Sequence, residues 1–240
     1  MARVPKRNKS RVITRLTKNF KCGKIAMTRT LEKRRYDYFR AYLFDGAELS
    51  GPFGFPQLKR TSFRPENPVS FVESRTKYRL NDKWLHFYAE DLNFECVWTN
   101  PKNYIERFKR FAGVITPDFS MYGDLPRAYQ IWNCYRNRAL AWWMQYNGVN
   151  IVPSVSWSDN SSFDWCFDGL DTGGTVSVSG NGCYYNPYAR QRFIIGFEEM
   201  RRRLRPDLIV GVGYIPKELR KTSELIILPG YSQQRAVRNG

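Results

Sequence analysis

A strand–loop–helix pattern recurs from Trp84 to the C-terminus, and it limits the chain to a small set of folds. Short apolar stretches have the length and composition of buried strands, and they lie at 84–88, 113–116, 149–157, 175–179, 208–213 and 225–228. Because helical stretches separate them, crossover connections are needed and the sheet should be mostly parallel. We therefore predict an α/β fold with five or six strands and crossover helices, either an open doubly wound sheet or an incomplete TIM-like barrel.

The helices of this pattern have recognisable starts. Two Asn-Pro pairs, Asn100-Pro101 and Asn186-Pro187, predict N-termini, because Asn caps free amides and Pro fits the first helical position. A longer helix is expected between Asp124 and Gly148. Its apolar residues recur at helical spacing and predict a stripe that faces the core, comprising Ala128, Ile131, Trp132, Tyr135, Ala139, Trp142, Trp143 and Tyr146.

The length of 240 residues favours one main domain with smaller additions. We expect a basic arm and helix at 1–44, and a Gly- and Pro-rich irregular lobe at 45–83. The α/β domain should then occupy 84–229, followed by a tail at 230–240.

Positive charge is concentrated at the N-terminus. The net charge is +17, and residues 1–40 hold 14 Lys or Arg against two acids, which leaves only +5 for the other 200 residues. Such a cluster is typical of an arm that binds DNA or RNA by neutralising phosphates, although a solubilising tail is the alternative. The expected nucleic-acid-binding residues are Arg3, Lys6, Arg7, Lys9, Arg11, Arg15, Lys18, Lys21, Lys24, Arg29, Lys33, Arg34 and Arg35.

Three aspartates follow predicted strands at the edge where loops of a parallel sheet converge. Asp91, Asp118 and Asp159 could together hold Mg²⁺ or Mn²⁺, the ions that carboxylate oxygens prefer, and serve phosphate chemistry. The alternative is that they cap turns or are solvated. Aromatic and polar residues at the same edge, where bases or sugars could stack, are Phe119, Ser120, Trp157, Tyr184 and Tyr214.

Other classes are excluded by what the chain lacks. A single histidine, His86, is too few for zinc proteases and for His-metal nucleases, and we expect it to pack within its strand. Five scattered cysteines without a CxxC pair indicate reduced thiols. No apolar run reaches the ~18 residues that span a bilayer, so we expect no membrane partner and a cytoplasmic location.

Two stretches carry a family resemblance: VITPDFSMYGDLP, and then QIWNCYRNRALAWWMQYNGVNIVPSVSW. Together with WLHFYAEDLNFECVWTNP, FDWCFDGL and VSVSGNGC, they make 84–213 similar to the family catalogued as domain of unknown function 4417. Members of that family occur in bacteria, phages and integrative elements. The resemblance implies a phage or mobile-element setting, hence the host cytosol, and it implies no catalytic role for any residue.

Three functional hypotheses remain open. The first is a nucleic-acid-binding accessory protein of a phage or mobile element, with the arm on phosphates. The second is a metal-dependent hydrolase of a phosphodiester or another anionic substrate. The third is a structural or inhibitory protein that acts on a nucleoprotein complex through a protein partner.

Overall fold

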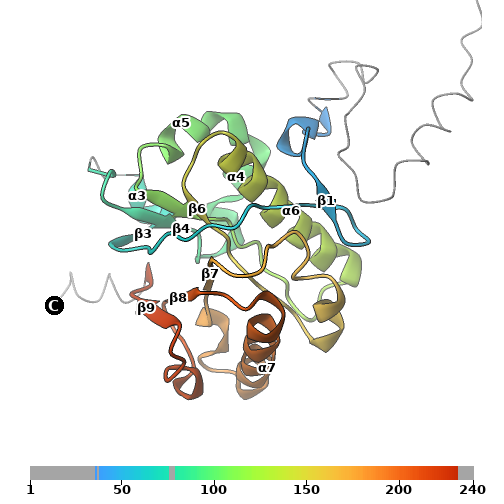
Figure 1. Ribbon diagram of the computed structural model, residues 1–240, viewed down its shortest axis with the longest axis vertical. Coiled ribbons are helices and arrows are strands. Elements are labelled where there is room, and N and C mark those ends of the chain that lie inside the picture. The colour runs from blue at the N-terminus through green and yellow to red at the C-terminus, as the bar shows by residue number, and fades with distance from the viewer. Residues whose placement is uncertain (1–35, 37, 76–78, 232–240) are drawn as a thin grey trace, which may run out of the picture.

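The computed structural model describes residues 36, 38–75 and 79–231 (Figure 1). The basic residues from Arg3 to Arg35, expected to bind nucleic acid, lie outside the described residues, as does most of the expected C-terminal tail. The expectations for those segments therefore stay predictions.

Two parallel sheets form the centre of the fold. The first has four strands: β3 (Pro68–Ser70), β4 (Trp84–His86), β5 (Gly113–Ile115) and β6 (Ile151–Val152). The second has three: β7 (Thr175–Val178), β8 (Leu208–Val212) and β9 (Leu225–Leu228). A parallel bridge between Ser154 and Ser177 connects them. The predicted α/β class with parallel strands is confirmed.

The strand order can be compared with the two predicted arrangements. Neighbouring strands follow each other in sequence order, without the reversal that a doubly wound sheet requires. The hydroxyl of Tyr88, just after β4, lies 2.9 Å from Oγ of Ser177 on β7. Three strand spacings, about 14 Å on a flat sheet, exceed the reach of these side chains, so the sheet curls. The strands therefore form a curled parallel arrangement, and within the described residues no pairing joins β3 to β9.

The concave side of the curled sheet holds its own apolar cluster. Trp84, Ile115, Val152 and Val210 meet there, although they come from strands of both sheets. Side chains alternate along a strand, so Leu85 points the other way and joins the outer core. The inner face is therefore packed with side chains, as in a small barrel.

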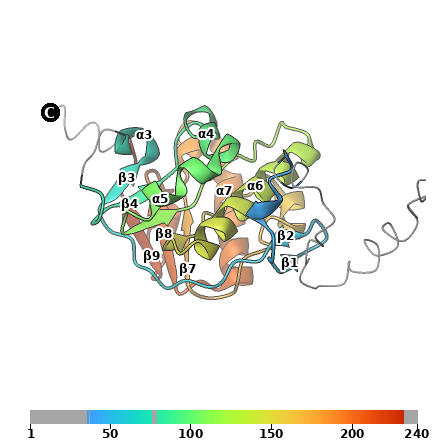
Figure 2. The same cartoon turned by 90° about the horizontal axis from the view of Figure 1, so that it is seen from above.

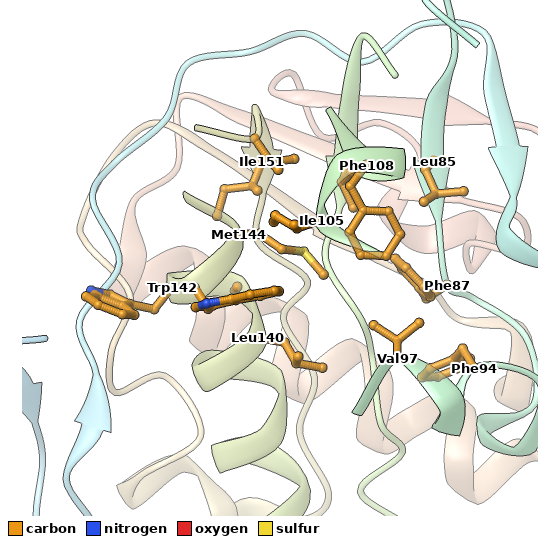
Figure 3. Close-up of a cluster of buried hydrophobic side chains, with 14 of the residues drawn as sticks. Leu85, Phe87, Phe94, Val97, Ile105, Phe108, Leu140, Trp142, Met144 and Ile151 are labelled. Atoms are coloured by element: carbon orange, nitrogen blue, oxygen red, sulfur yellow. The ribbon is translucent and has the colours of Figure 1, made fainter. Parts of the chain in front are cut away.

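Helices cover the convex side of the sheet (Figures 1 and 2). They are α3 (Phe71–Ser74), α4 (Glu95–Thr99), α5 (Ile105–Phe108), α6 (Arg127–Tyr146) and α7 (Pro187–Leu204). Figure 3 shows the core between α4, α5, α6 and the first sheet, where Phe87, Phe94, Val97 and Phe108 point toward one another. A second core lies between α7 and the second sheet.

The stretch 45–83, expected to be irregular, contributes three strands. A short antiparallel pair, β1 (Leu49–Ser50) with β2 (Phe55–Pro56), is followed by β3, which pairs with β4. The sheet therefore begins before Trp84. The sequence analysis did not predict β3, because this strand has only three residues and begins with a proline, a residue typical of loops.

The two Asn-Pro pairs behave differently. The side chain of Asn186 accepts hydrogen bonds from the N–H groups of Tyr188 (3.0 Å) and Ala189 (3.1 Å), as predicted for a cap. Asn100 makes no such bond, and the helix expected after it is split into a 3-10 turn, Pro101–Asn103, and α5. An Asn-Pro pair therefore does not by itself set the length of the helix that follows: α7 has 18 residues and α5 has four.

The stripe predicted on α6 is confirmed only between Ala139 and Trp143. Ala139, Trp142 and Trp143 are buried, but the side chains of Trp132 and Tyr146 are 43% and 72% exposed. The middle of α6 is buried on all sides, including its polar residues, because it is enclosed by both cores. The prediction of a single buried face therefore underestimated the burial of α6.

Candidate functional site

The carboxyl ends of β4 and β5 carry two of the predicted carboxylates. Asp91 lies at the start of a 3-10 turn, Asp91–Asn93, and accepts hydrogen bonds from the N–H (3.1 Å) and the hydroxyl (3.0 Å) of Ser120. Burial raises the pKa of Asp91, while these bonds from Ser120 act against that shift. Asp91 therefore joins the end of β4 to the loop that follows β5. The hydroxyl of Ser120, a predicted rim residue, donates to this carboxylate.

The loop Pro117–Ser120, which we call the clamped loop, is also held from α6. The side chain of Asn137 accepts from the N–H of Phe119 (2.8 Å) and donates to its carbonyl (3.2 Å). One turn earlier, Asn133 donates to the carbonyl of Ser120 at 2.7 Å. Buried backbone groups require such partners, so the buried amides on α6 fix this loop in one conformation.

Arg136 fastens the same region to α4. Its guanidinium donates to both carboxylate oxygens of Glu95, at 2.7 and 3.0 Å, and to Oδ1 of Asn133 at 2.7 Å. It also lies over the ring of Phe119, 3.7 Å from the centroid. Phe119 is fully buried beneath it, so this predicted rim aromatic cannot stack on a ligand.

Arg138 holds the neighbouring loop after β6. It is 2% exposed and donates to three backbone carbonyls: those of Asp168 (3.0 Å), Ser154 (3.3 Å) and Cys166 (2.7 Å). A buried cation needs such acceptors, because its desolvation is otherwise costly. Arg138 is therefore a structural residue that joins α6 to the second core.

Of the three predicted carboxylates, Asp118 is the one with a buried oxygen, Oδ1, that has no hydrogen-bond partner among the described residues. Burial is the main cause that raises the pKa of Asp118 to about 7, and the charge of Asp91 adds to it, while Ser156 and Arg138 act in the opposite direction. Asp118 can therefore gain or lose a proton near neutral pH.

Asp159 does not join the other two. It lies after β6, where its carboxylate accepts from the N–H (2.9 Å) and hydroxyl (2.6 Å) of Ser161 and caps the 3-10 turn Asn160–Asp164. In the part of the chain that the structure describes, no group of three His, Cys, Asp or Glu side chains could hold a metal ion. The three carboxylates of the predicted Mg²⁺ or Mn²⁺ site, Asp91, Asp118 and Asp159, are therefore not brought together, because Asp159 caps its own turn.

Polar side chains on the inner face of the sheet are mostly satisfied by one another. The Tyr88–Ser177 bond continues to the carbonyl of Val210 (2.8 Å), and Ser154 bonds to the Pro117 carbonyl (2.8 Å). His86 is completely buried, as expected for a packed residue, and burial lowers its pKa to about 4. The imidazole is therefore neutral at pH 7, which does not suit a cationic binding role.

Of the remaining predicted rim aromatics, Trp157 and Tyr214 are half-buried and Tyr184 is exposed. Trp157 packs on Phe193 of α7, with ring centroids 5.2 Å apart. Tyr184, which follows the 3-10 turn η5 (Asn181–Cys183) after β7, is exposed and meets the rings of Tyr185 and Tyr214 edge-on, at 4.5 and 5.0 Å. We call Tyr184, Tyr185, Tyr188 and Tyr214 the tyrosine surface.

A shallow apolar groove is a feature that no sequence pattern indicated. Its volume is about 300 Å³, and it lies between the β1–β2 hairpin and the first half of α6. It is lined by Phe53, Phe55, Ala128, Ile131, Trp132 and Tyr135. Its four residues on α6 belong to the apolar stripe that was predicted to face the core.

None of the helices in the described ranges is long and apolar enough to cross a membrane. The cysteines that the structure describes, Cys96, Cys134, Cys166 and Cys183, are free, in agreement with the expected reduced thiols. These observations fit the sequence without adding a further candidate site.

Comparison with known proteins places the chain in a family. Residues 47–231 match the model of a domain of unknown function, DUF4417, which extends the resemblance found at 84–213 toward the N-terminus. The match covers more than half of the chain, so the protein belongs to the DUF4417 family. No solved structure matches it.

Two phage proteins are similar to the chain. The Gene 1 protein of Mycobacterium phage L5 is 32% identical over 170 residues, which cover 70% of this chain and 74% of that protein. The Gene 1 protein of Mycobacterium phage D29 is 32% identical over 166 residues, which cover 68% of this chain but only 62% of the relative. The chain is thus a homologue of phage gene 1 proteins.

Proposed function

We propose that this member of the DUF4417 family is a nucleic-acid-binding accessory protein of a phage or mobile genetic element, acting in the host cytosol. The basic N-terminal arm contacts phosphates, and the α/β domain carries the arm and supplies further contacts. The observation that carries the proposal is the charge distribution: residues 1–40 hold 14 Lys or Arg against two acids. Binding of this kind releases counterions and has little sequence preference.

The end of the arm is anchored on the α/β domain, which supports its use as a binding element. Leu43 is buried in the first core, and the ring of Tyr42 meets that of Trp143 at 6.0 Å. The guanidinium of Arg40 lies over the ring of Trp98, 5.2 Å from its centroid. A bound arm is therefore coupled to α4 and α6, and it holds the domain against the nucleic acid.

The test is a salt series of binding measurements with the full-length chain. One variant replaces Lys6, Arg7, Lys9 and Arg11 by Gln, and a control variant removes the same charge from four exposed body residues, Lys59, Lys109, Arg202 and Arg205. Fluorescence anisotropy reports affinity for single- and double-stranded DNA and RNA.

We expect wild-type affinity to fall by on the order of 10³-fold between about 50 and 200 mM salt. The arm variant should bind more weakly with a shallower salt dependence, whereas the control should stay close to wild type. Equal loss in both variants, or affinity that does not change with salt, would contradict the proposal.

A further inference from the structure

We infer that the tyrosine surface binds single-stranded nucleic acid by stacking bases on its rings. This inference rests on the proposed function and specifies which form of nucleic acid the α/β domain contacts. Every base has an aromatic face, and in a duplex that face is covered by its neighbours. A surface of exposed tyrosines therefore selects strands whose bases are free to leave the stack.

The exposure of these rings is the first observation. The side chains of Tyr185 and Tyr188 are 92% and 80% exposed, and Tyr184 is 59% exposed. Tyr184 is approached edge-on by Tyr185 and Tyr214, with interplanar angles of 86° and 87°. Edge contacts leave the faces of the outer rings open, which is the surface that a base needs for stacking.

Charge around the tyrosines is the second observation, and it matches a phosphate backbone. The stretch 172–197, which contains three of the four tyrosines, has no acidic residue. Exposed cations lie on α7, which begins beside Tyr188, and in the stretch 217–221, which follows Tyr214. Glu218 is paired with Arg190, while four of these neighbouring cations form no ion pair within the described residues: Arg192, Lys217, Arg220 and Lys221.

The backbone that carries the tyrosines is rigidly mounted, which favours binding. The side chain of Asn181 accepts from the N–H of Tyr214 at 2.9 Å, and Gly180 donates to the Tyr214 carbonyl at 3.0 Å. The cap made by Asn186 fixes the start of α7 beside Tyr188. Because the rings stand on fixed backbone, less conformational entropy is lost when a strand binds.

Arg192 connects this surface to the loop after β5. A β-carbon added at Gly123 would lie 2.6 Å from Nη1 of Arg192, so the guanidinium is in contact with that loop. Tyr122 beside it is 56% exposed. A strand that crosses the tyrosine surface can therefore continue past Arg192 toward the clamped loop.

The experiment compares a thymidine oligonucleotide of about 20 residues with a duplex of equal length, using full-length protein throughout. The test variants are Tyr185→Ala, Tyr188→Ala and the double variant, with Tyr185→Phe and Tyr188→Phe to keep the rings. Tyr146→Ala is the matched control, because Tyr146 is also largely exposed, at 72%, and lies at the far end of α6.

We expect each Tyr→Ala change to weaken single-strand binding by about 10-fold and to leave duplex binding within 2-fold, since stacking is lost but charge is not. The Phe variants and Tyr146→Ala should match wild type. The salt dependence should be unchanged in all of them, which separates this effect from that of the arm.

Equal single-strand affinity of wild type and both Ala variants would overturn the inference while leaving the arm-based proposal intact. A chain that binds no nucleic acid at low salt would overturn both. Sedimentation provides a further check: if Tyr185→Ala dissociates a dimer and spares binding, the surface contacts a second copy of the chain and the inference is wrong.

Discussion

The clamped loop and the tyrosine surface both follow strands of the same curled sheet, yet they use their side chains in opposite ways. In the clamped loop, Phe119 is buried and its backbone N–H and carbonyl are both bonded to Asn137. In the tyrosine surface, Tyr185 and Tyr188 project into solvent. Polar residues at strand ends therefore serve the fold in one place, and aromatic residues are left free for contacts in the other.

The same contrast accounts for the separate roles of the three predicted carboxylates, which form no common group in the described residues. The carboxylates of Asp91 and Asp159 accept hydrogen bonds from Ser120 and Ser161, respectively. Among these three aspartates, only Asp118 has a buried oxygen without a hydrogen-bond partner in the part of the chain that the structure describes, and one carboxylate cannot replace a metal-binding group of three. Changes in the clamped region should therefore affect stability, whereas changes in the tyrosine surface should affect binding.

The largest effect is expected for Arg138→Met. The three carbonyls that Arg138 satisfies would be left buried and unpaired, so the free energy of unfolding should fall by about 3–5 kcal/mol. Urea unfolding followed by tryptophan fluorescence measures this. Arg202→Met, at an exposed pair on α7, is the control and should change stability by less than about 0.5 kcal/mol. Similar losses in both variants would show that burial of Arg138 has no special importance.

A smaller loss is expected for Asn137→Ala. It removes the two bonds to the backbone of Phe119 and leaves a small cavity, which should cost about 3 kcal/mol. Hydrogen exchange should then accelerate at the Phe119 amide, and unfolding measurements give the cost. If exchange at that amide stays slow, the loop is held mainly by Asp91 and Arg136, and the role of Asn137 is overestimated.

The third effect depends on pH. Because the folded-state pKa of Asp118 is raised from 3.8 to about 7, its ionisation destabilises the fold as pH rises through that range. Asp118→Asn should therefore stabilise the protein by about 2 kcal/mol at pH 8 and lose this advantage toward pH 4. Thermal unfolding from pH 4 to 8 measures the difference, with Asp159→Asn as a control, since its pKa is lowered instead. A constant difference across this range would contradict the shifted pKa.

The smallest effect on stability is expected for the tyrosine surface. Tyr185→Ala and Tyr188→Ala should change the free energy of unfolding by less than about 0.5 kcal/mol, because these side chains are already solvated in the folded state. The same urea titrations measure it. A loss comparable to that of Asn137→Ala would place these rings within the packed structure and remove the contrast between the two regions.

Local signals predicted the elements that depend on neighbouring residues. The strands β4, β5, β7, β8 and β9 lie within the predicted stretches, and the cap at Asn186 was correctly placed. Asp159 formed a turn cap, the alternative that its local sequence also allowed. These features were predictable because their partners lie within a few residues along the chain.

Partners distant in sequence could not be predicted in this way. β3 is a strand because β4 offers it a parallel partner, although Pro68 and its surroundings resemble a loop. Arg136 and Arg138 are buried because α6 lies between two cores, which helical periodicity alone does not reveal. The exposed Tyr185 and the buried Phe119 are equally aromatic in sequence, and only packing separates them.

By itself, the sequence determined the α/β class, the parallel direction of the strands and the concentration of charge at the N-terminus, because these follow from periodicity, crossover length and composition. Only the tertiary structure decided that the sheet curls, that Asp91 and Asp118 come together without Asp159, and which aromatics face solvent. Those outcomes depend on long-range packing and on competition for hydrogen bonds, in which each side chain takes the best partner the fold offers.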